Sequence, residues 1–259
     1  MASVSRRKPS LADRHILVSC LSILAGVVIW QGIATQVSGL VLPSPAEVVM
    51  KLGNAAFLAR LLPAFGNFLF SLGVGFAISL AIAIPVGTIL GRSSVLSRMF
   101  EPTITAIYAI PPVAFVPFLV VWFGLFFEAR VALVVLMTVF DMLIVIIAGA
   151  RDVRASLVDV GRSFGASRLE RFRLIVFPAL LPFLFAALRV GIARAINGMI
   201  TAELFFAAVN LGKLIKRAGQ NFDTATVFLI VVSVSILGLV CQSILTRLER
   251  RLLHWNIKR

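Results

Sequence analysis

Residues 131–150 read VALVVLMTVFDMLIVIIAGA, twenty consecutive positions that contain one charged side chain, Asp141. About 20 apolar residues in an α-helix cross the roughly 30 Å hydrocarbon core of a bilayer. Working outward, comparable stretches cover residues 15–46, 61–91, 102–127, 174–202 and 224–246. They predict six membrane-spanning helices, near residues 16–36, 65–90, 103–126, 130–150, 180–206 and 224–246, between tails at 1–15 and 247–259. A membrane barrel would need alternating polarity, which these stretches do not have.

The composition of the whole chain agrees with that prediction. Of 259 residues, 60% are hydrophobic and 14% charged, whereas soluble domains have about 45–50% and about 25%. A water-soluble globule, a disordered chain, a collagen-like repeat and a disulfide scaffold are therefore excluded. The two cysteines, Cys20 and Cys241, lie in apolar runs and are predicted to be inert thiols. The expected fold class is an all-α integral membrane protein.

The net charge of +14 indicates sidedness rather than nucleic-acid binding. No basic run is interleaved with aromatic residues in the way that nucleic-acid binding requires. With a cytoplasmic N-terminus, 17 Lys and Arg residues fall on inner segments and six on outer ones, which predicts that both termini are cytoplasmic. The first apolar segment is long and is not followed by an Ala-x-Ala site, so we expect an uncleaved helix rather than a signal peptide.

Two segments between the spans carry helix-start signals. In the outer segment, Ser44, Pro45 and Glu47 form a capping-box pattern that predicts a short amphipathic surface helix, unless the segment is only a connection. The inner segment 151–178 contains more of these helix signals. Its apolar residues recur at helical spacing over 152–164, and Gly165 suits the residue that ends such a helix.

A second helix is expected directly after Gly165. Ser167 and Glu170 form another capping box, and Pro178 is predicted to limit the helix that begins there. The segment should therefore be a helix–Gly–helix hairpin with a charged outer face at the cytoplasmic membrane surface. Such a device is typical of a docking site for a cytoplasmic partner.

The hairpin resembles a known loop. Gly165 is followed after nine residues by IVFP at 175–178, which is similar to the Glu-Ala-Ala loop of ABC importer permeases, the binding-protein-dependent inner-membrane components. In that loop Glu-Ala-Ala, three residues, Gly and nine residues precede Ile-x-Leu-Pro. This chain has DVG at 159–161 in place of Glu-Ala-Ala, and Phe177 in place of Leu.

The resemblance covers nearly the whole chain and is most specific to the nitrate/sulfonate/taurine subfamily. The stretches that carry it are LPSP (42–45), IPPVAFVP (110–117), WFG (122–124), GRSFGAS (161–167), ALR (187–189) and AEL (202–204). One departure is Asp141, which stands where that subfamily usually has proline. The resemblance implies the six-helix fold of a type I importer permease in a bacterial inner membrane. It favours nitrate, sulfonates or taurine as the imported solute.

The resemblance also implies partners and a mechanism. Two permease copies, expected to be a homodimer, would form the pore, with two ATP-binding subunits below and a periplasmic or lipid-anchored substrate-binding protein above. ATP and Mg²⁺ would be held by the ATP-binding subunits, and this chain would bind no cofactor. Alternating access would follow rigid-body movement of the coupling hairpin. The residues implied in coupling are Asp159, Gly161, Ser163, Gly165, Ala166, Ser167 and Arg168.

Prolines and charges inside the predicted spans are candidates for the translocation path. Pro111, Pro112 and Pro117 free backbone carbonyls, as in broken helices that line substrate routes, although a structural kink would need the same residues. Asp141, Arg189 and Arg194 should avoid lipid. They are expected either to pair and brace the helices or to place the arginines in the pore, where they would attract an anion.

Glu203 is expected near the outer end of the fifth span, where it would contact the binding protein, cap the gate, or be a solvated helix-end charge. Lys213, Lys216 and Arg217 are expected in a wetted outer loop or a binding-protein footprint.

Several chemistries have no motif in this sequence. It contains no Walker A stretch, no His-Glu-x-x-His and no Gly-x-Ser-x-Gly, and its two histidines, His15 and His254, lie near the termini. We therefore expect a non-catalytic permease without a metal site. The alternative is a stand-alone secondary transporter with Asp141 as its ion-coupling site, which would have no use for an ATPase-docking hairpin. An intramembrane enzyme is a remote third possibility.

Overall fold

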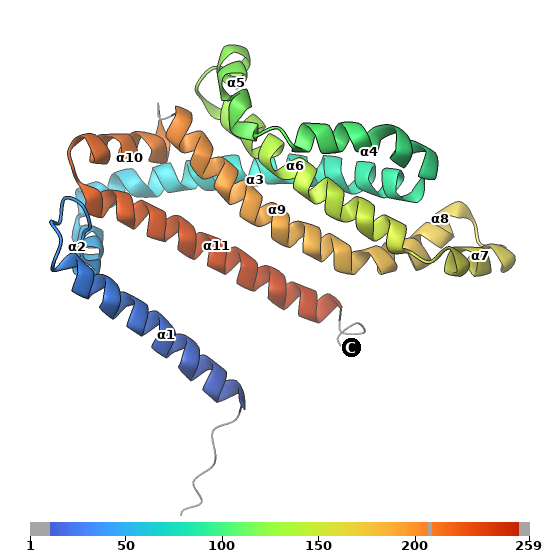
Figure 1. Ribbon diagram of the computed structural model, residues 1–259, viewed down its shortest axis with the longest axis horizontal. Helices are drawn as coiled ribbons and strands as arrows, with labels where there is room; N and C mark the ends of the chain where they lie inside the picture. Colours follow the sequence, from blue (N-terminus) through green and yellow to red (C-terminus); the bar gives the residue numbers. More distant parts are fainter. Residues whose placement is uncertain (1–10, 207–208, 254–259) are drawn as a thin grey trace, which may run out of the picture.

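The computed structural model describes residues 11–206 and 209–253; for residues 11–17, 19 and 20 it describes only the backbone (Figure 1). All regular secondary structure in the described residues is helical. In order its α-helices are α1 (Leu11–Ala34), α2 (Pro45–Met50), α3 (Ala55–Arg92), α4 (Ser94–Tyr108), α5 (Val116–Phe123), α6 (Phe127–Asp152), α7 (Ala155–Ser163), α8 (Arg168–Arg171), α9 (Phe177–Phe206), α10 (Asn210–Gln220) and α11 (Thr224–Leu252). Short 3₁₀ turns occupy Lys51–Gly53 and Pro112–Phe115, and a π-helical turn occupies Phe172–Val176.

The all-α membrane fold is confirmed, but the predicted number of six spans is not reproduced among the described residues. Among the described residues four helices are long and apolar enough to cross a membrane: α3, α6, the continuous segment Arg168–Phe206, and α11. A fifth span arises only if the bent pair Ser94–Tyr108 and Pro112–Phe123 is counted as one crossing. In α1 the apolar stretch Leu21–Ala34 is shorter than the four long apolar helices.

The span predicted over 103–126 is not one continuous helix, because the chain breaks in its middle. Helix α4 ends at Tyr108, and the segment from Pro112 leaves it at an angle of 81°. Pro111 and Pro112 have no amide hydrogen to donate. In addition, the proline at 112 sterically disfavours the helical conformation at the residue before it. Pro111 accordingly adopts φ −57° and ψ 119°, outside the helical region.

Helix α6 runs between α3 and α9 and forms the centre of the bundle (Figure 1). Glycines on α3 allow α6 to approach closely: a Cβ atom on Gly87 would lie 2.8 Å from Cγ2 of Ile146, and one on Gly75 would lie 2.7 Å from Cγ1 of Val134. Small residues serve this purpose in membranes, where helix association depends on packing. The glycines of α3 therefore hold the two helices at short range.

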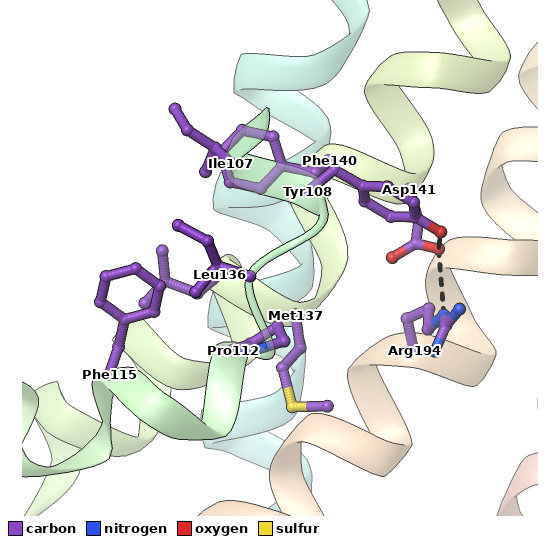
Figure 2. Close-up of a pocket in the computed structure, with 10 residues that line it drawn as sticks. Ile107, Tyr108, Pro112, Phe115, Leu136, Met137, Phe140, Asp141 and Arg194 are labelled. Carbon is purple, nitrogen blue, oxygen red and sulfur yellow. Dashed lines mark hydrogen bonds and ion pairs between the residues drawn. The ribbon is translucent and has the colours of Figure 1, made fainter. Parts of the chain in front are cut away.

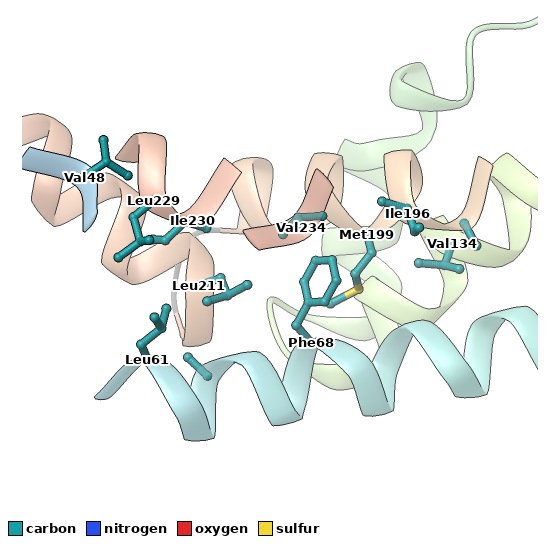
Figure 3. Close-up of a cluster of buried hydrophobic side chains, with 12 residues drawn as sticks. Val48, Leu61, Phe68, Val134, Ile196, Met199, Leu211, Leu229, Ile230 and Val234 are labelled. Carbon is teal, nitrogen blue, oxygen red and sulfur yellow. The ribbon is translucent and has the colours of Figure 1, made fainter. Parts of the chain in front are cut away.

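Near α10 the core gathers side chains from six helices (Figure 3). Its buried members include Val48 of α2, Leu61 and Phe68 of α3, Val134 of α6, Met199 of α9, Leu211 of α10, and Leu229 of α11. In contrast, α1 leaves this bundle near α2 (Figure 1), and the side chains of residues 21–29 are exposed. Trp30 anchors the end of α1 by donating a hydrogen bond from Nε1 to the carbonyl of Pro43 at 3.0 Å. The exposed face of α1 must be covered by lipid or by another chain.

Replacing Gly87 by leucine is expected to destabilise the bundle by about 1–3 kcal/mol, the usual cost of overpacking. The new side chain would collide with Ile146 and Leu143 of α6. Thermal unfolding of the purified protein in detergent measures the effect. Gly73→Leu on the same helix is the matched control, because a Cβ atom there meets nothing within 4 Å. Equal losses of stability in the two variants would contradict the proposed close packing.

Candidate functional site

A cavity of about 580 Å³ lies where α4, the chain break, α6 and α9 meet (Figure 2). Most of its lining is apolar. The lining side chains are Ile107, Tyr108, Ile110, Pro112, Phe115, Leu136, Met137, Phe140, Asp141 and Arg194. Among these lining residues, Tyr108, Asp141 and Arg194 are the ones with polar or charged side chains. Its volume falls in the range of small-molecule sites, which are mostly apolar with a few convergent polar groups.

The three polar residues form one hydrogen-bonded group. Nε of Arg194 donates to Oδ1 of Asp141 at 3.0 Å, and the Tyr108 hydroxyl donates to the same oxygen at 3.3 Å. The Arg194 side chain is 46% exposed, whereas that of Asp141 is 13% exposed. The group therefore connects the end of α4 to the middle of α6 and of α9, and it leaves the guanidinium accessible from the cavity.

Arg189 does not pair with Asp141, although pairing was one of the two alternatives expected for the charges inside the spans. Arg189 forms an ion pair with Glu249 of α11, and its carbonyl accepts a hydrogen bond from Nε2 of Gln242 at 2.9 Å. Residues five positions apart on a helix point about 140° apart, so α9 directs Arg194 toward α6 and Arg189 toward α11. Arg189 is thus outside the cavity.

Of the three candidate prolines, Pro112 lines the cavity and also belongs to the break. Pro111 caps the 3₁₀ turn, and Pro117 lies in the first turn of α5, where a proline's missing amide hydrogen is tolerated. Neither of these two lines the cavity. Of these three prolines, Pro112 both belongs to the break in the helix and lines the cavity.

Glu203 is neither a solvated helix-end charge nor a surface for a binding protein, because it is buried. Its side chain is 2% exposed and pairs with Nη1 of Arg130, which is 7% exposed, at 3.1 Å. It also accepts a hydrogen bond from the backbone N–H of Gly212 at 2.7 Å. The positive N-terminal end of α10 thus adds to the attraction from Arg130. Sequence reasoning did not single out Arg130 as a site residue, although it directly adjoins the apolar stretch that starts at residue 131.

The expected outer loop around Lys213, Lys216 and Arg217 is the helix α10, with these three side chains exposed. Next to it, Asp223 caps α11 and pairs with Nζ of Lys51 at 2.7 Å. Burial raises the pKa of the Asp223 carboxyl, but hydrogen bonds from Lys51 and Thr226 outweigh it and leave the pKa below its usual value. This end of the bundle is therefore polar and cationic on its surface.

The hairpin lies at the opposite end of the bundle and has the predicted local signals (Figure 1). Gly165 has φ +78°; its N–H donates to the carbonyl of Arg162, and the N–H of Ala166 donates to the carbonyl of Gly161, both at 3.0 Å. Together these bonds form a Schellman motif, which needs a left-handed residue at Gly165. Ser167 and Glu170 form the predicted capping box.

Two predicted boundaries of the hairpin are wrong. Its first helix starts at Ala155 rather than 152, because α6 continues to Asp152 and Val153 is extended. Its second helix does not stop before Pro178 but runs into α9 through the π-helical turn Phe172–Val176. In that turn the Phe177 N–H reaches the carbonyl of Phe172. The wider turn accommodates Pro178, which cannot donate a hydrogen bond of its own.

The remaining surface of the hairpin is accessible. Asp159, Ser163, Ser167 and Arg168 are exposed, and Gly161 and Ala166 are partly covered. The apolar side chains of α7 and the turn after it also face outward: Leu157 is 49%, Val160 is 54% and Phe164 is 87% exposed.

Two arginines, Arg92 and Arg151, hold the start of the hairpin in place, and sequence reasoning did not single them out. Nη1 of Arg92 donates to the carbonyls of Ala150 and Val153, at 3.4 and 3.2 Å. Nη2 of Arg151 lies 2.5 Å from Oε1 of Glu101 and donates to Oγ of Ser97 at 2.7 Å; both partners are on α4. The hairpin is thus joined to α3 and α4 as well as to α6 and α9.

Comparison with known proteins shows what this arrangement is. Residues 83–254 match the family profile described as "Binding-protein-dependent transport system inner membrane component". The taurine transport system permease protein of Escherichia coli (strain K12) is 27% identical over 251 residues, which cover 94% of this chain and 91% of that protein. A Bacillus subtilis (strain 168) permease named for aliphatic sulfonates transport is 25% identical over 257 residues, 98% of this chain and 93% of that protein.

A solved structure shows the same fold. The inward-facing MetNI methionine ABC transporter contains a chain that aligns with a TM-score of 0.63 at 19% identity, covering 77% of this chain and 99% of that one. The family match spans more than half of the sequence and includes both the cavity and the hairpin. The chain therefore belongs to the binding-protein-dependent transport system inner membrane components, the permeases of ABC importers.

Proposed function

We propose that this chain forms half of the translocation path of an ATP-driven importer in a bacterial inner membrane. As a member of its family it is a permease component of an ABC importer for small solutes. The proposal adds a second copy of the same chain, two ATP-binding subunits, and a periplasmic or lipid-anchored binding protein that delivers the solute. Both termini would be cytoplasmic, in agreement with the excess of basic residues on inner segments.

The observation that carries the proposal is the hairpin. It combines a Schellman motif at Gly165 with a capping box at Ser167, and the apolar side chain of Phe164 beside this turn is 87% exposed. Such a surface has no internal partner among the described residues, and it suits docking into a groove of a cytoplasmic ATPase subunit. ATP and Mg²⁺ would bind to that subunit and not to this chain.

At the opposite end of the bundle, the exposed Lys213, Lys216 and Arg217 of α10 are suited to contact a binding protein. The solute is proposed to be a small anion, such as nitrate, a sulfonate or taurine. The names of the taurine and sulfonate relatives support this class, and so does the accessible Arg194 in the cavity.

Co-purification followed by reconstitution tests the proposal. The tagged permease is expected to retain an ATP-binding subunit through purification. Proteoliposomes that contain the complex and its binding protein should take up solute only with Mg-ATP. Uptake by the permease alone, driven by an ion gradient, would contradict the proposal and would favour the secondary transporter with Asp141 as its coupling site.

A further inference from the structure

We infer that Arg130 is a positioning residue of the import cycle. It joins α10, whose exposed face is suited to the binding protein, to the corner between α5 and α6, so that docking at α10 moves the wall of the cavity. The inference rests on the proposed function, because it takes α10 to be the docking surface. It goes beyond that function by assigning the transmission of the docking signal to one buried side chain and its partners.

Arg130 holds three separate parts of the fold together. Its side chain is buried, and its guanidinium donates from Nη1 to Oε1 of Glu203 on α9 at 3.1 Å and from Nε to the carbonyl of Phe126 at 3.2 Å. With the side-chain amide oxygen of Asn210 turned toward the guanidinium, Nη2 also donates to this first residue of α10 at 3.2 Å. One side chain therefore contacts α9, α10 and the residue that precedes α6.

Glu203 links Arg130 to the cationic face of α10. Helices α5 and α10 both lie at the end of α9 that holds Glu203 (Figure 1). Oε2 of Glu203 accepts a hydrogen bond from the backbone N–H of Gly212 at 2.7 Å, and Gly212 directly precedes the exposed Lys213. A shift of α10 toward a docked protein must carry the Glu203 carboxylate along or leave the buried charge of Arg130 without its counter-ion, which is strongly unfavourable.

The corner between α5 and α6 continues into the cavity wall. Gly124 ends α5 with φ 74° and ψ −155°, a conformation that essentially only glycine adopts. The chain then enters α6 through Phe126, whose carbonyl is held by Arg130. Helix α5 packs on α6 in a shared apolar cluster, and it directly follows the 3₁₀ turn Pro112–Phe115, both ends of which line the cavity. Packed side chains and hydrogen bonds of this kind carry energetic coupling between distant sites.

ATP hydrolysis by the whole transporter in nanodiscs, measured against the concentration of its solute-loaded binding protein, tests the inference. The variant is R130M/E203L, which replaces the ion pair by apolar side chains and so leaves no unpaired buried charge. Its basal hydrolysis rate and its half-saturating concentration of binding protein should stay at the parental values, because the hairpin and the exposed face of α10 are unchanged. Stimulation by the binding protein should fall at least about fivefold, the low end of the usual coupling between two sites.

The matched control is K51M/D223N, which removes another ion pair and keeps a capping side chain at the start of α11. This pair joins the segment after α2 to α11 and does not involve the α5–α6 corner, so the control should be stimulated like the parent transporter. Parental stimulation of R130M/E203L, or a basal rate that falls as much as the stimulation does, would overturn the inference and leave the proposed function intact. A parent transporter that the binding protein does not stimulate would contradict both.

Hydrogen exchange of the parent transporter provides a measurement that needs no variant. Addition of the solute-loaded binding protein should change the exchange of backbone amides in residues 124–130 as well as in residues 210–217. In R130M/E203L the change should be confined to residues 210–217. A change confined to residues 210–217 in the parent transporter would show that docking does not reach the α5–α6 corner, and it would also overturn the inference.

Discussion

Replacement of Glu203 by leucine is expected to lower the free energy of unfolding by about 3–5 kcal/mol, the usual cost of removing one partner of a buried ion pair. The Glu203 carboxylate is the acceptor for both Nη1 of Arg130 and the N–H of Gly212. Without it the Arg130 side chain, which is 7% exposed, keeps its charge but loses its counter-ion. The first turn of α10 loses its acceptor as well, so unfolding should start at this end of the bundle.

A double variant separates two effects on stability: the cost of leaving Arg130 buried without a partner, and the loss of the ion pair itself. Arg130→Met combined with Glu203→Leu replaces the ion pair by apolar groups, and such replacements are often neutral or stabilising. We expect the double variant to regain most of the stability that Glu203→Leu loses, as measured by chemical unfolding in detergent. Lys51→Met is the control, because the Lys51–Asp223 pair is about one-third exposed on both sides and should contribute at most about 1 kcal/mol. A Glu203→Leu loss no larger than that of Lys51→Met would contradict the assigned role.

The sequence was sufficient for features that depend on neighbours along the chain. The turn at Gly165 and the capping boxes at Ser44 and Ser167 each need only a few consecutive residues, and all three are confirmed. The apolar stretches likewise indicated the all-α membrane fold, because bilayer thickness alone determines the length of a span.

Features that depend on tertiary contact could not be derived in the same way. Arg130 and Glu203 are 73 positions apart, and nothing in either local sequence shows that they meet. Arg194 and Arg189 both look like mid-span charges, yet the rotation of α9 decides that only Arg194 reaches Asp141. The prolines at 111 and 112 indicated a disturbance, but whether a helix kinks or breaks by 81° depends on how its two parts pack.

Replacement of Gly165 by valine is expected to uncouple ATP hydrolysis from uptake. Gly165 has φ +78°, and a Cβ atom there would meet no neighbour within 4 Å. The turn would therefore be destabilised through the backbone conformation alone. A left-handed conformation costs an ordinary residue about 1–2 kcal/mol, and β-branched residues such as valine adopt it very rarely. That energy corresponds to a factor of about 5–30 in the population of the native turn. If the hairpin is the ATPase dock, uptake should fall by at least a similar factor.

The distinguishing measurement is the ratio of solute taken up to ATP hydrolysed in proteoliposomes that contain the whole transporter. Gly161→Val should act on the same hairpin by a different route, since its Cβ would lie 2.7 Å from Cδ1 of Ile175 and the end of that side chain would have to move. Gly73→Val, where open space surrounds the Cβ position, controls for the substitution itself and should leave the ratio unchanged. Both hairpin variants should keep the bundle folded, because the Arg130–Glu203 pair lies at the other end. A Gly165→Val transporter that imports solute at the parental ratio would show that the hairpin does not couple hydrolysis to transport.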